Sequence, residues 1–324
     1  MNKDNYFCSK YHFLYLKGIA ILAVIIGHIG NYSGKTYFTP LGGIGVAIFL
    51  FCSGYGLMTS YRNKGLFSFW KKKLTAIYFP FVLVEIITAV ILRRELSDVV
   101  LELLFLKRLH PFGWYMQYLI ACYFLFWLGV KYISNQRIRN GIWVTLAIVS
   151  FFLFGNLQGE QAISFLSGVL LAEYRNESNS LDRVQMPAGG ENQRKYFLTG
   201  GLMLCVAVLL LAVKQLPVVR AQNHYWLTLL NLAMKTSCAA GCLLVTNGVR
   251  PLEKLVLWFG RTSYSLYLVH GYFMFIIGNN VFGNYVVNSI VMLALSLGSA
   301  VILNKLNGIF TKKLQEVDRW NQKC

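Results

Sequence analysis

Two ionisable side chains mark the first apolar stretch of the chain, Phe13 to Ile29, which reads FLYLKGIAILAVIIGHI. Lys17 lies near its start and His28 near its end, and nothing between them is ionisable. Eleven helical steps of about 100° come to roughly 20° past three full turns, so both side chains leave one face of a helix, about 16 Å apart along its axis. One helix therefore offers a charge near one membrane surface and a titratable nitrogen deeper in.

Alternatives remain open for both side chains. A histidine inside a membrane helix usually faces the bundle interior or a wet cavity, which makes His28 a functional candidate. A histidine near the outer interface can equally well hydrogen-bond a neighbouring helix and do nothing more. Taken alone, Lys17 is better explained as a cation that snorkels to the cytoplasmic headgroups.

Three consecutive lysines, Lys71, Lys72 and Lys73, stand at a helix start in SFWKKKLTAIYFPF. Such a cluster usually determines topology, and it can also cradle a polyphosphate ligand such as coenzyme A together with the lysine of the first helix. In GGIGVAIFLFCSGYGL, the small residues favour close packing of helices. Ser53 and Tyr55 of this stretch are candidates for lining a pocket, although packing explains the stretch without them.

A second intramembrane histidine, His270, lies in WFGRTSYSLYLVHGYF. Ser263, Tyr267 and His270 follow at intervals of four and three residues, so they form one polar stripe on a helix, with Tyr264 beside it. A stripe of hydroxyls and imidazole in lipid either seals against another polar stripe or lines a cavity.

Glu85 and Lys235 are the remaining charges in the middle of apolar stretches. Each lies about 13 Å from the end of its own predicted helix, so their depths are similar in a hydrocarbon core of about 30 Å. The default interpretation is a structural ion pair between them. The seven cysteines make no metal-ligand spacing, so no metal site is expected.

The composition predicts a polytopic membrane protein. Of 324 residues, 56% are hydrophobic and 14% are charged, with a mean hydropathy of +0.50, whereas about a quarter of an average soluble domain is charged. The net charge of +18 sits in short loops between apolar stretches, where cations set topology and meet anionic lipid, so nucleic-acid binding is not expected. No cleavage site precedes the first span, and the N-terminus is expected to be kept as a signal anchor.

Apolar stretches predict an all-α bundle of about ten transmembrane helices in a single domain, residues 1–324. Twenty-two lysines and arginines fall in the segments that are inner if the N-terminus is inside, against seven in the outer ones, which predicts that both termini are cytoplasmic. The expected spans are 13–30, 41–60, 76–92, 113–130, 142–157, 161–174, 196–213, 226–246, 258–278 and 285–303.

Two polar segments interrupt this pattern. Residues 175–195 read as a flexible cytoplasmic connection between two groups of helices. The outer segment 93–112 contains the amphipathic stretch LSDVVLELLFLKRL, which predicts a short helix in the membrane interface.

Taken together, these stretches resemble the acyltransferase-3 family of integral membrane acyltransferases along the whole chain. LKGIAILAVIIGH is similar to the first helix of the family, in which a basic residue is followed by ten others and then the histidine. GVAIFLFCSGY, KKKLTAIYFPF and GWYMQYLIACYFLF resemble its second, third and fourth helices, and FLSGVLLAEY and SYSLYLVH complete the order. Two positions depart from the family pattern, because Lys17 replaces the usual arginine and Ala76 stands where a second arginine of the third-helix entry is usual.

The resemblance implies transfer of an acyl group, most often acetyl, from cytoplasmic acyl-coenzyme A to a hydroxyl of a cell-envelope glycan, free or lipid-linked. It implies no bound cofactor, with acetyl-coenzyme A as cosubstrate, and it makes a bacterial inner membrane the expected location. His28 is then the general base or a transient acyl carrier. The donor phosphates would be held by Lys17, Lys71, Lys72 and Lys73, and the acceptor side would be shaped by Ser53, Tyr55, Trp114, Tyr115, Tyr264, Tyr267 and His270.

Two other functions compete with this one. A carrier for an envelope glycan or small solute would use the charged pair and the histidines as a coupling site, but it predicts paired, broken helices in corresponding halves, which the sequence does not show. A structural partner of a glycan polymerase with a decayed active site is supported only by the lysine at position 17. The sequence does not name the acceptor, the acyl group or the oligomeric state.

Overall fold

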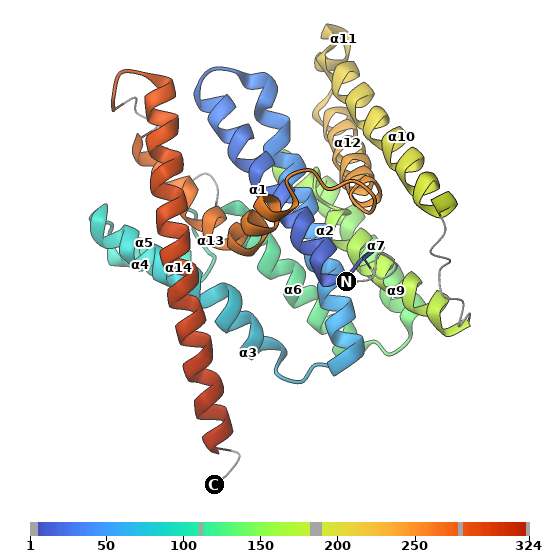
Figure 1. Ribbon diagram of the computed structural model, residues 1–324, viewed down its shortest axis with the longest axis horizontal. Helices are drawn as coiled ribbons and strands as arrows, with labels where there is room; N and C mark the ends of the chain where they lie inside the picture. The colour runs from blue at the N-terminus through green and yellow to red at the C-terminus, as the bar shows by residue number, and fades with distance from the viewer. Residues whose placement is uncertain (1–5, 110–112, 182–189, 278–280, 322–324) are drawn as a thin grey trace. The chain divides into compact units, whose positions relative to one another are not determined.

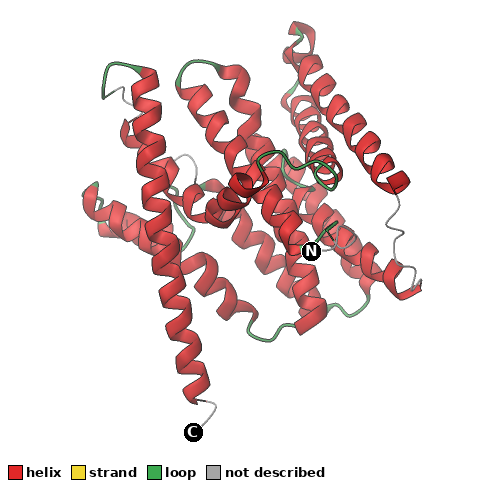
Figure 2. Cartoon of the chain, in the orientation of Figure 1, coloured by secondary structure: helices red, strands yellow, loops and turns green. Residues whose placement is uncertain are grey.

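The computed structural model describes residues 6–109, 113–181, 190–277 and 281–321. Helices and connecting loops make up these residues, and no strand occurs within the described ranges (Figure 2). Each of the ten predicted apolar stretches falls on a helix, so the predicted all-α class is confirmed.

Six helical stretches of the described residues are long and apolar enough to cross a membrane: Lys10–Tyr32, Thr36–Lys64, Phe69–Ile91, Gln193–Gln215, His224–Val245 and Tyr285–Leu314. The chain is therefore a multi-pass membrane protein. Ten crossings and cytoplasmic termini stay predictions. Two other long helices, α6 (Trp114–Tyr132) and α13 (Glu253–Ile277), are rich in tyrosine, tryptophan or serine, which lowers their hydropathy.

The chain divides into two compact units. The first unit comprises Met1–Gly65 and Ala121–Arg261, the second comprises Leu66–Ile120 and Thr262–Cys324, and the division falls within α6 (Trp114–Tyr132) and α13 (Glu253–Ile277). The other elements of the first unit are α1 (Lys10–Tyr32), η2 (Thr36–Phe38), α2 (Thr39–Lys64), α7 (Gln136–Leu153), α8 (Asn156–Gly159), α9 (Ser164–Leu181), α10 (Gly190–Gln215), α11 (Pro217–Arg220) and α12 (His224–Val245). Those of the second unit are α3 (Phe69–Lys73), η3 (Leu74–Tyr78), α4 (Phe79–Ile91), α5 (Leu96–Leu103) and α14 (Tyr285–Asn321).

Glycines set the spacing of the helices in the first unit. α1 and α2 lie side by side and antiparallel (Figure 1), and a Cβ added at Gly27 would come within 2.5 Å of the Gly42 nitrogen. α2 and α9 pack just as closely, since Gly54 faces the Phe165 carbonyl and Gly168 faces the Phe51 carbonyl. The Gln161 side chain, just before α9, donates to the Gly43 carbonyl near the start of α2, and Arg62 near the end of α2 donates to the Ala172 and Glu173 carbonyls of α9. These two helices therefore run parallel, as the predicted topology requires of spans two and six.

In the second unit, the third predicted span begins irregularly. η3 has the wide turns of a π-helix and leads directly into α4, which has Pro80 in its first turn. The Tyr264 hydroxyl of α13 donates a hydrogen bond of 2.6 Å to the Ile77 carbonyl in η3. The Phe79 ring stacks on Phe310 of α14 at 3.7 Å between centroids. Packing from two neighbouring helices therefore supports a segment that is not a regular α-helix.

Two polar segments differ in how far they match expectation. A helix, α5, is present in the segment 93–112 where an interfacial helix was predicted, and Leu96, Val100 and the C-cap residue Leu104 form an exposed apolar stripe along it. Its place in the membrane interface stays a prediction. The predicted loop 175–195 is instead largely helical, because α9 continues to Leu181 and α10 begins at Gly190. Residues 182–189 of that predicted loop lie outside the described residues. Polar helices extend beyond apolar spans where water solvates their outer turns, which a search for apolar runs does not detect.

Candidate active site

The helix that carries Lys17 and His28 is continuous. Ser9 caps α1 by accepting a hydrogen bond of 3.2 Å from the His12 nitrogen, and the helix then runs unbroken to Tyr32. Both Lys17 and His28 are half-buried on it. The predicted spacing of a cation and an imidazole on one helical face is therefore realised.

His28 lies against the point where α1 and α2 cross. A Cβ added at Gly42 would be 3.9 Å from the His28 Cε1 atom, at ordinary contact distance. The next residue, Gly43, is in contact with Lys235 of α12, because a Cβ there would lie 2.5 Å from Cε and 2.7 Å from Nζ. The His28 imidazole and the buried Lys235 ammonium group thus lie beside two consecutive glycines of α2.

Lys235 has a partner that the sequence analysis missed. Its ammonium forms an ion pair with Glu160, which follows α8, and Asn231 also donates to the Glu160 carboxylate. Lys214 of α10 donates to the Asn231 Oδ1 atom at 2.8 Å. Lys235 is only 4% exposed, so the Glu160 carboxylate neutralises a charge that burial would otherwise make costly, and the Asn231 amide orients that carboxylate.

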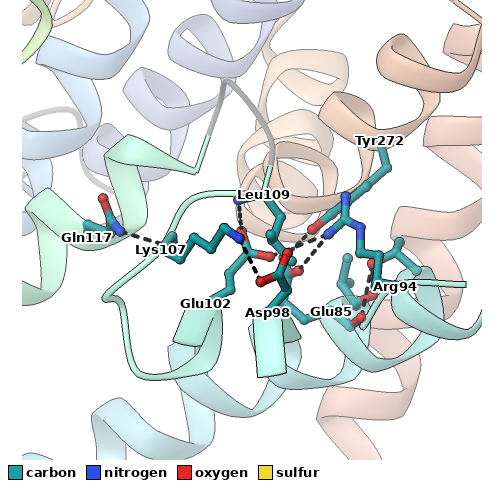
Figure 3. Close-up of polar contacts among 10 residues, drawn as sticks. Glu85, Arg94, Asp98, Glu102, Lys107, Leu109, Gln117 and Tyr272 are labelled. Carbon is teal, nitrogen blue, oxygen red and sulfur yellow. Dashed lines mark hydrogen bonds and ion pairs between the residues drawn. The ribbon is translucent and has the colours of Figure 1, made fainter. Parts of the chain in front are cut away.

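Glu85 has its partners in the second unit (Figure 3). Its carboxylate, 2% exposed, accepts a hydrogen bond from the Tyr272 hydroxyl, and its Oε2 atom lies 3.7 Å from the Arg94 Nη1 atom. Arg94 Nη1 is also 3.4 Å from Glu102 Oε2, and Glu102 Oε1 accepts from the Leu109 nitrogen at 3.1 Å. This network ties α5 and the segment that follows it to α4 and α13.

The sequence analysis predicted an ion pair between Glu85 and Lys235, and the structure gives each of them a different partner. Equal depth along two helices sets only the height of a charge, not the direction in which the side chain points or the helix that it meets. Each charge found a partner within its own unit, Glu160 for Lys235 and Arg94 for Glu85.

The lysine cluster forms α3 in the second unit. Lys71 and Lys72 are exposed, and the Lys72 Nζ atom donates to the Phe67 carbonyl at 3.2 Å. The Lys73 ammonium lies 5.8 Å from the centroid of the Phe69 ring. Their role in binding a donor stays a prediction, as does that of Lys17 in the first unit.

Aromatic residues of the predicted acceptor pocket come together in the second unit. The rings of Tyr115 and Tyr267 meet edge to face at 4.8 Å, and Trp114 packs beside Tyr115. The Tyr267 ring lies 5.4 Å from His270, whose Nδ1 atom is 2.6 Å from the Tyr267 carbonyl and 3.1 Å from that of Leu266. Since carbonyl oxygens only accept, Nδ1 carries a proton.

The other two pocket candidates lie on α2 in the first unit. Ser53 is half-buried and hydrogen-bonds Tyr123 of α6. The Tyr55 ring stacks on Phe13 of α1 at 4.3 Å, and its hydroxyl accepts a hydrogen bond of 3.1 Å from Arg175 Nη1. The structure therefore places Tyr55 beside the first half of α1, against Phe13, which lies one turn before Lys17, and not beside His28.

A histidine that the sequence analysis passed over is fully buried. His12 accepts from the Cys8 nitrogen on Nδ1 at 3.1 Å and donates from Nε2 to the Thr246 hydroxyl at 2.8 Å. Both ring nitrogens are thus used within the protein, which fits a structural role. Nothing in its local sequence distinguishes this histidine, because its partner Thr246 is far away in the chain.

The segment before α1 is packed against the protein. The Arg250 guanidinium lies 3.9 Å from the centroid of the Tyr6 ring, and the Phe7 ring stacks on Tyr196 at 4.9 Å. Burial raises the pKa of the Tyr6 hydroxyl to about 12 and that of the Cys8 thiol to about 11. Both groups are therefore neutral near pH 7. Within the described ranges, no three His, Cys, Asp or Glu side chains gather as a metal site.

These features define a polytopic membrane protein with a cation and an imidazole on one helix. The family model described as an acyltransferase domain matches residues 12–305, so the chain belongs to the acyltransferase-3 family and is a membrane acyltransferase. The match includes Lys17, His28 and His270. No curated protein and no solved structure matches the chain.

Proposed function

We propose that this protein transfers an acetyl or similar acyl group from cytoplasmic acyl-coenzyme A to a hydroxyl of a cell-envelope glycan, such as a surface polysaccharide or exopolysaccharide. The observation that carries the proposal is α1, an unbroken helix in a membrane acyltransferase that holds Lys17 and His28 on one face. The membrane is proposed to be a bacterial inner membrane, with both termini cytoplasmic.

The proposed reaction is balanced in protons. The Nε2 or Nδ1 atom of neutral His28 removes the proton from the acceptor hydroxyl, and the oxygen attacks the thioester carbonyl. The tetrahedral intermediate expels the coenzyme A thiolate, which takes the proton back from the imidazolium. Lys17 and the lysines of α3 would bind the donor phosphates, and Tyr264, Tyr267, His270 and Trp114 would contact the acceptor.

The first experiment measures acyl-coenzyme A turnover by purified protein in lipid vesicles supplied with an envelope glycan. His28→Ala is expected to lose turnover at least a hundredfold, because general-base catalysis contributes about 10²–10⁴-fold. His224→Ala is the matched control, since that histidine is exposed at the start of α12. Full turnover by the His28 variant would rule out its proposed role, and transport of glycan without acyl-coenzyme A consumption would favour a carrier.

A second measurement separates the two roles of His28. A transient acyl-imidazole would let the protein exchange label between acetyl-coenzyme A and free coenzyme A without any acceptor present. A general base would show no such exchange, because the thioester is then attacked only by the acceptor hydroxyl. The two mechanisms thus give opposite results with the same protein.

A further inference from the structure

Arg175 of α9 is a half-buried arginine in the first unit with no carboxylate partner among the described residues. Its Nη1 atom donates to two neutral oxygens, the Phe7 carbonyl and the Tyr55 hydroxyl, each at 3.1 Å. The Phe7 ring lies 5.3 Å from the centre of the guanidinium group. None of these contacts neutralises the positive charge.

Three other shielded arginines of the described residues are paired with carboxylates, whereas Arg62 donates to the backbone carbonyls of Ala172 and Glu173. Arg139 Nη2 is 2.8 Å from Glu173, Arg94 meets two carboxylates, and Arg250 lies 3.3 Å from Glu253. The Cys8 side chain beside Arg175 supplies no anion, because burial raises the pKa of this thiol to about 11. A guanidinium with neutral partners keeps its attraction for a phosphate, whose oxygens match its planar fork of donors.

The position of Arg175 relates it to the face of α1 that carries His28. Tyr55, which accepts from Arg175, stacks on Phe13 of α1. Phe13 and Lys17 are four residues apart and so lie on one helical face, which continues to His28. The path from Phe13 to His28 is about 22 Å along the helix axis, from 15 residues at about 1.5 Å each.

We propose that the Arg175 guanidinium, together with the Tyr55 hydroxyl, binds a phosphate group of the acyl donor at the inner end of α1. The inference rests on the proposed function, and it gives the site a planar guanidinium that Lys17 does not supply. The donor chain would then extend past Lys17 toward His28. The same phosphate chemistry is present in an anionic lipid headgroup, so the experiment has to separate the two sources.

The test compares two donors, acetyl-coenzyme A and S-acetylpantetheine, which lacks all phosphates. Arg175→Gln is expected to raise KM for acetyl-coenzyme A about tenfold to hundredfold, since a hydrogen bond to a charged group contributes about 1.5–3 kcal/mol. Its KM for S-acetylpantetheine and its kcat are expected to stay unchanged. Arg175→Lys should lose less, and Arg137→Gln, which removes an exposed cation at the start of α7, should lose nothing.

Equal losses with both donors would overturn the inference, because they would show that Arg175 only tethers the segment before α1. A loss that follows the phosphatidylglycerol content of the vesicles, and not the donor phosphates, would assign the site to lipid and would also overturn it. Titration calorimetry with coenzyme A measures binding of the donor phosphates independently of turnover. Arg175-dependent binding without turnover would refute the proposed function alone, and binding that ignores Arg175 would refute the inference alone.

Discussion

In the first unit the buried Lys235 ammonium meets one carboxylate, whereas in the second unit two buried carboxylates, Glu85 and Glu102, share one nitrogen of Arg94. The first arrangement is one ion pair, with the Asn231 amide on the same carboxylate. The second has one carboxylate more than it has cations, and each carboxylate accepts a further hydrogen bond, Glu85 from the Tyr272 hydroxyl and Glu102 from the Leu109 N–H group.

This difference predicts how much stability each network loses when one of its charged side chains is substituted. A one-to-one pair leaves an uncompensated buried charge when either partner is removed. A shared cation is the single point on which two carboxylates depend, so its loss should cost far more than the loss of one carboxylate. The four predictions below test this contrast, in decreasing order of effect.

Lys235→Met is expected to lower the free energy of unfolding by about 3–5 kcal/mol, because it leaves the Glu160 carboxylate without its cation. Glu160→Gln should cost a similar amount by stranding the ammonium. The double variant should recover most of the loss, which a double-mutant cycle in detergent measures. Lys254→Met, which alters an exposed lysine, is the control. Additive losses in the cycle would show that the pair does not act as a unit.

Arg94→Gln is expected to cost about 3 kcal/mol, since it leaves Glu85 and Glu102 facing each other without a cation. Glu85→Gln should cost only about 1 kcal/mol, because glutamine still accepts from Tyr272 and Glu102 keeps Arg94. Unfolding of both variants is followed in the same detergent. The proposed contrast would be contradicted if Glu85→Gln lowered the free energy of unfolding as much as Arg94→Gln does.

Gly43→Ala is expected to destabilise the protein by about 1–3 kcal/mol, because the added methyl would press on the Lys235 side chain and disturb its pair with Glu160. The preceding glycine provides a matched control on the same turn. Gly42→Ala places its methyl at ordinary contact distance from His28 and is expected to be neutral or stabilising. Equal thermal midpoints for the two variants would contradict the close contact.

Asp98→Asn is expected to change stability by less than about 1 kcal/mol. Asp98 lies 2.6 Å from Lys107, but both side chains are substantially exposed, and exposed pairs gain little. The small effect should shrink further in high salt. A loss comparable to that of Arg94→Gln would show that α5 is held by this exposed pair and not by Glu102.

Much of the fold followed from local pattern. An apolar run of sufficient length must satisfy its backbone hydrogen bonds internally, so each of the ten predicted stretches is helical, and the amphipathic stretch after Arg94 forms α5. The polar end of α9 and the polar start of α10 were not predicted to be helical. Helix propensity, and not hydropathy, decides whether a helix continues into water.

The site was less predictable. The shared face of Lys17 and His28 is a property of one helix and needed only the spacing along the chain. The environment of Tyr55 was not visible in its own sequence, because its hydroxyl partner, Arg175, lies 120 residues away. The same is true of the Lys235–Glu160 pair, whose members are 75 residues apart.

By itself the sequence determined the helical class, the membrane setting, the family and the spacing of cation and imidazole on α1, since each depends on composition or on periodicity within one segment. Only the tertiary structure decided which charge meets which, because a partner is chosen by the azimuth and register of packed helices. It placed Glu160 on Lys235, Arg94 between two glutamates, and Arg175 against Tyr55. Those choices depend on glycine contacts such as the α1–α2 crossing, which bring distant segments within hydrogen-bonding reach.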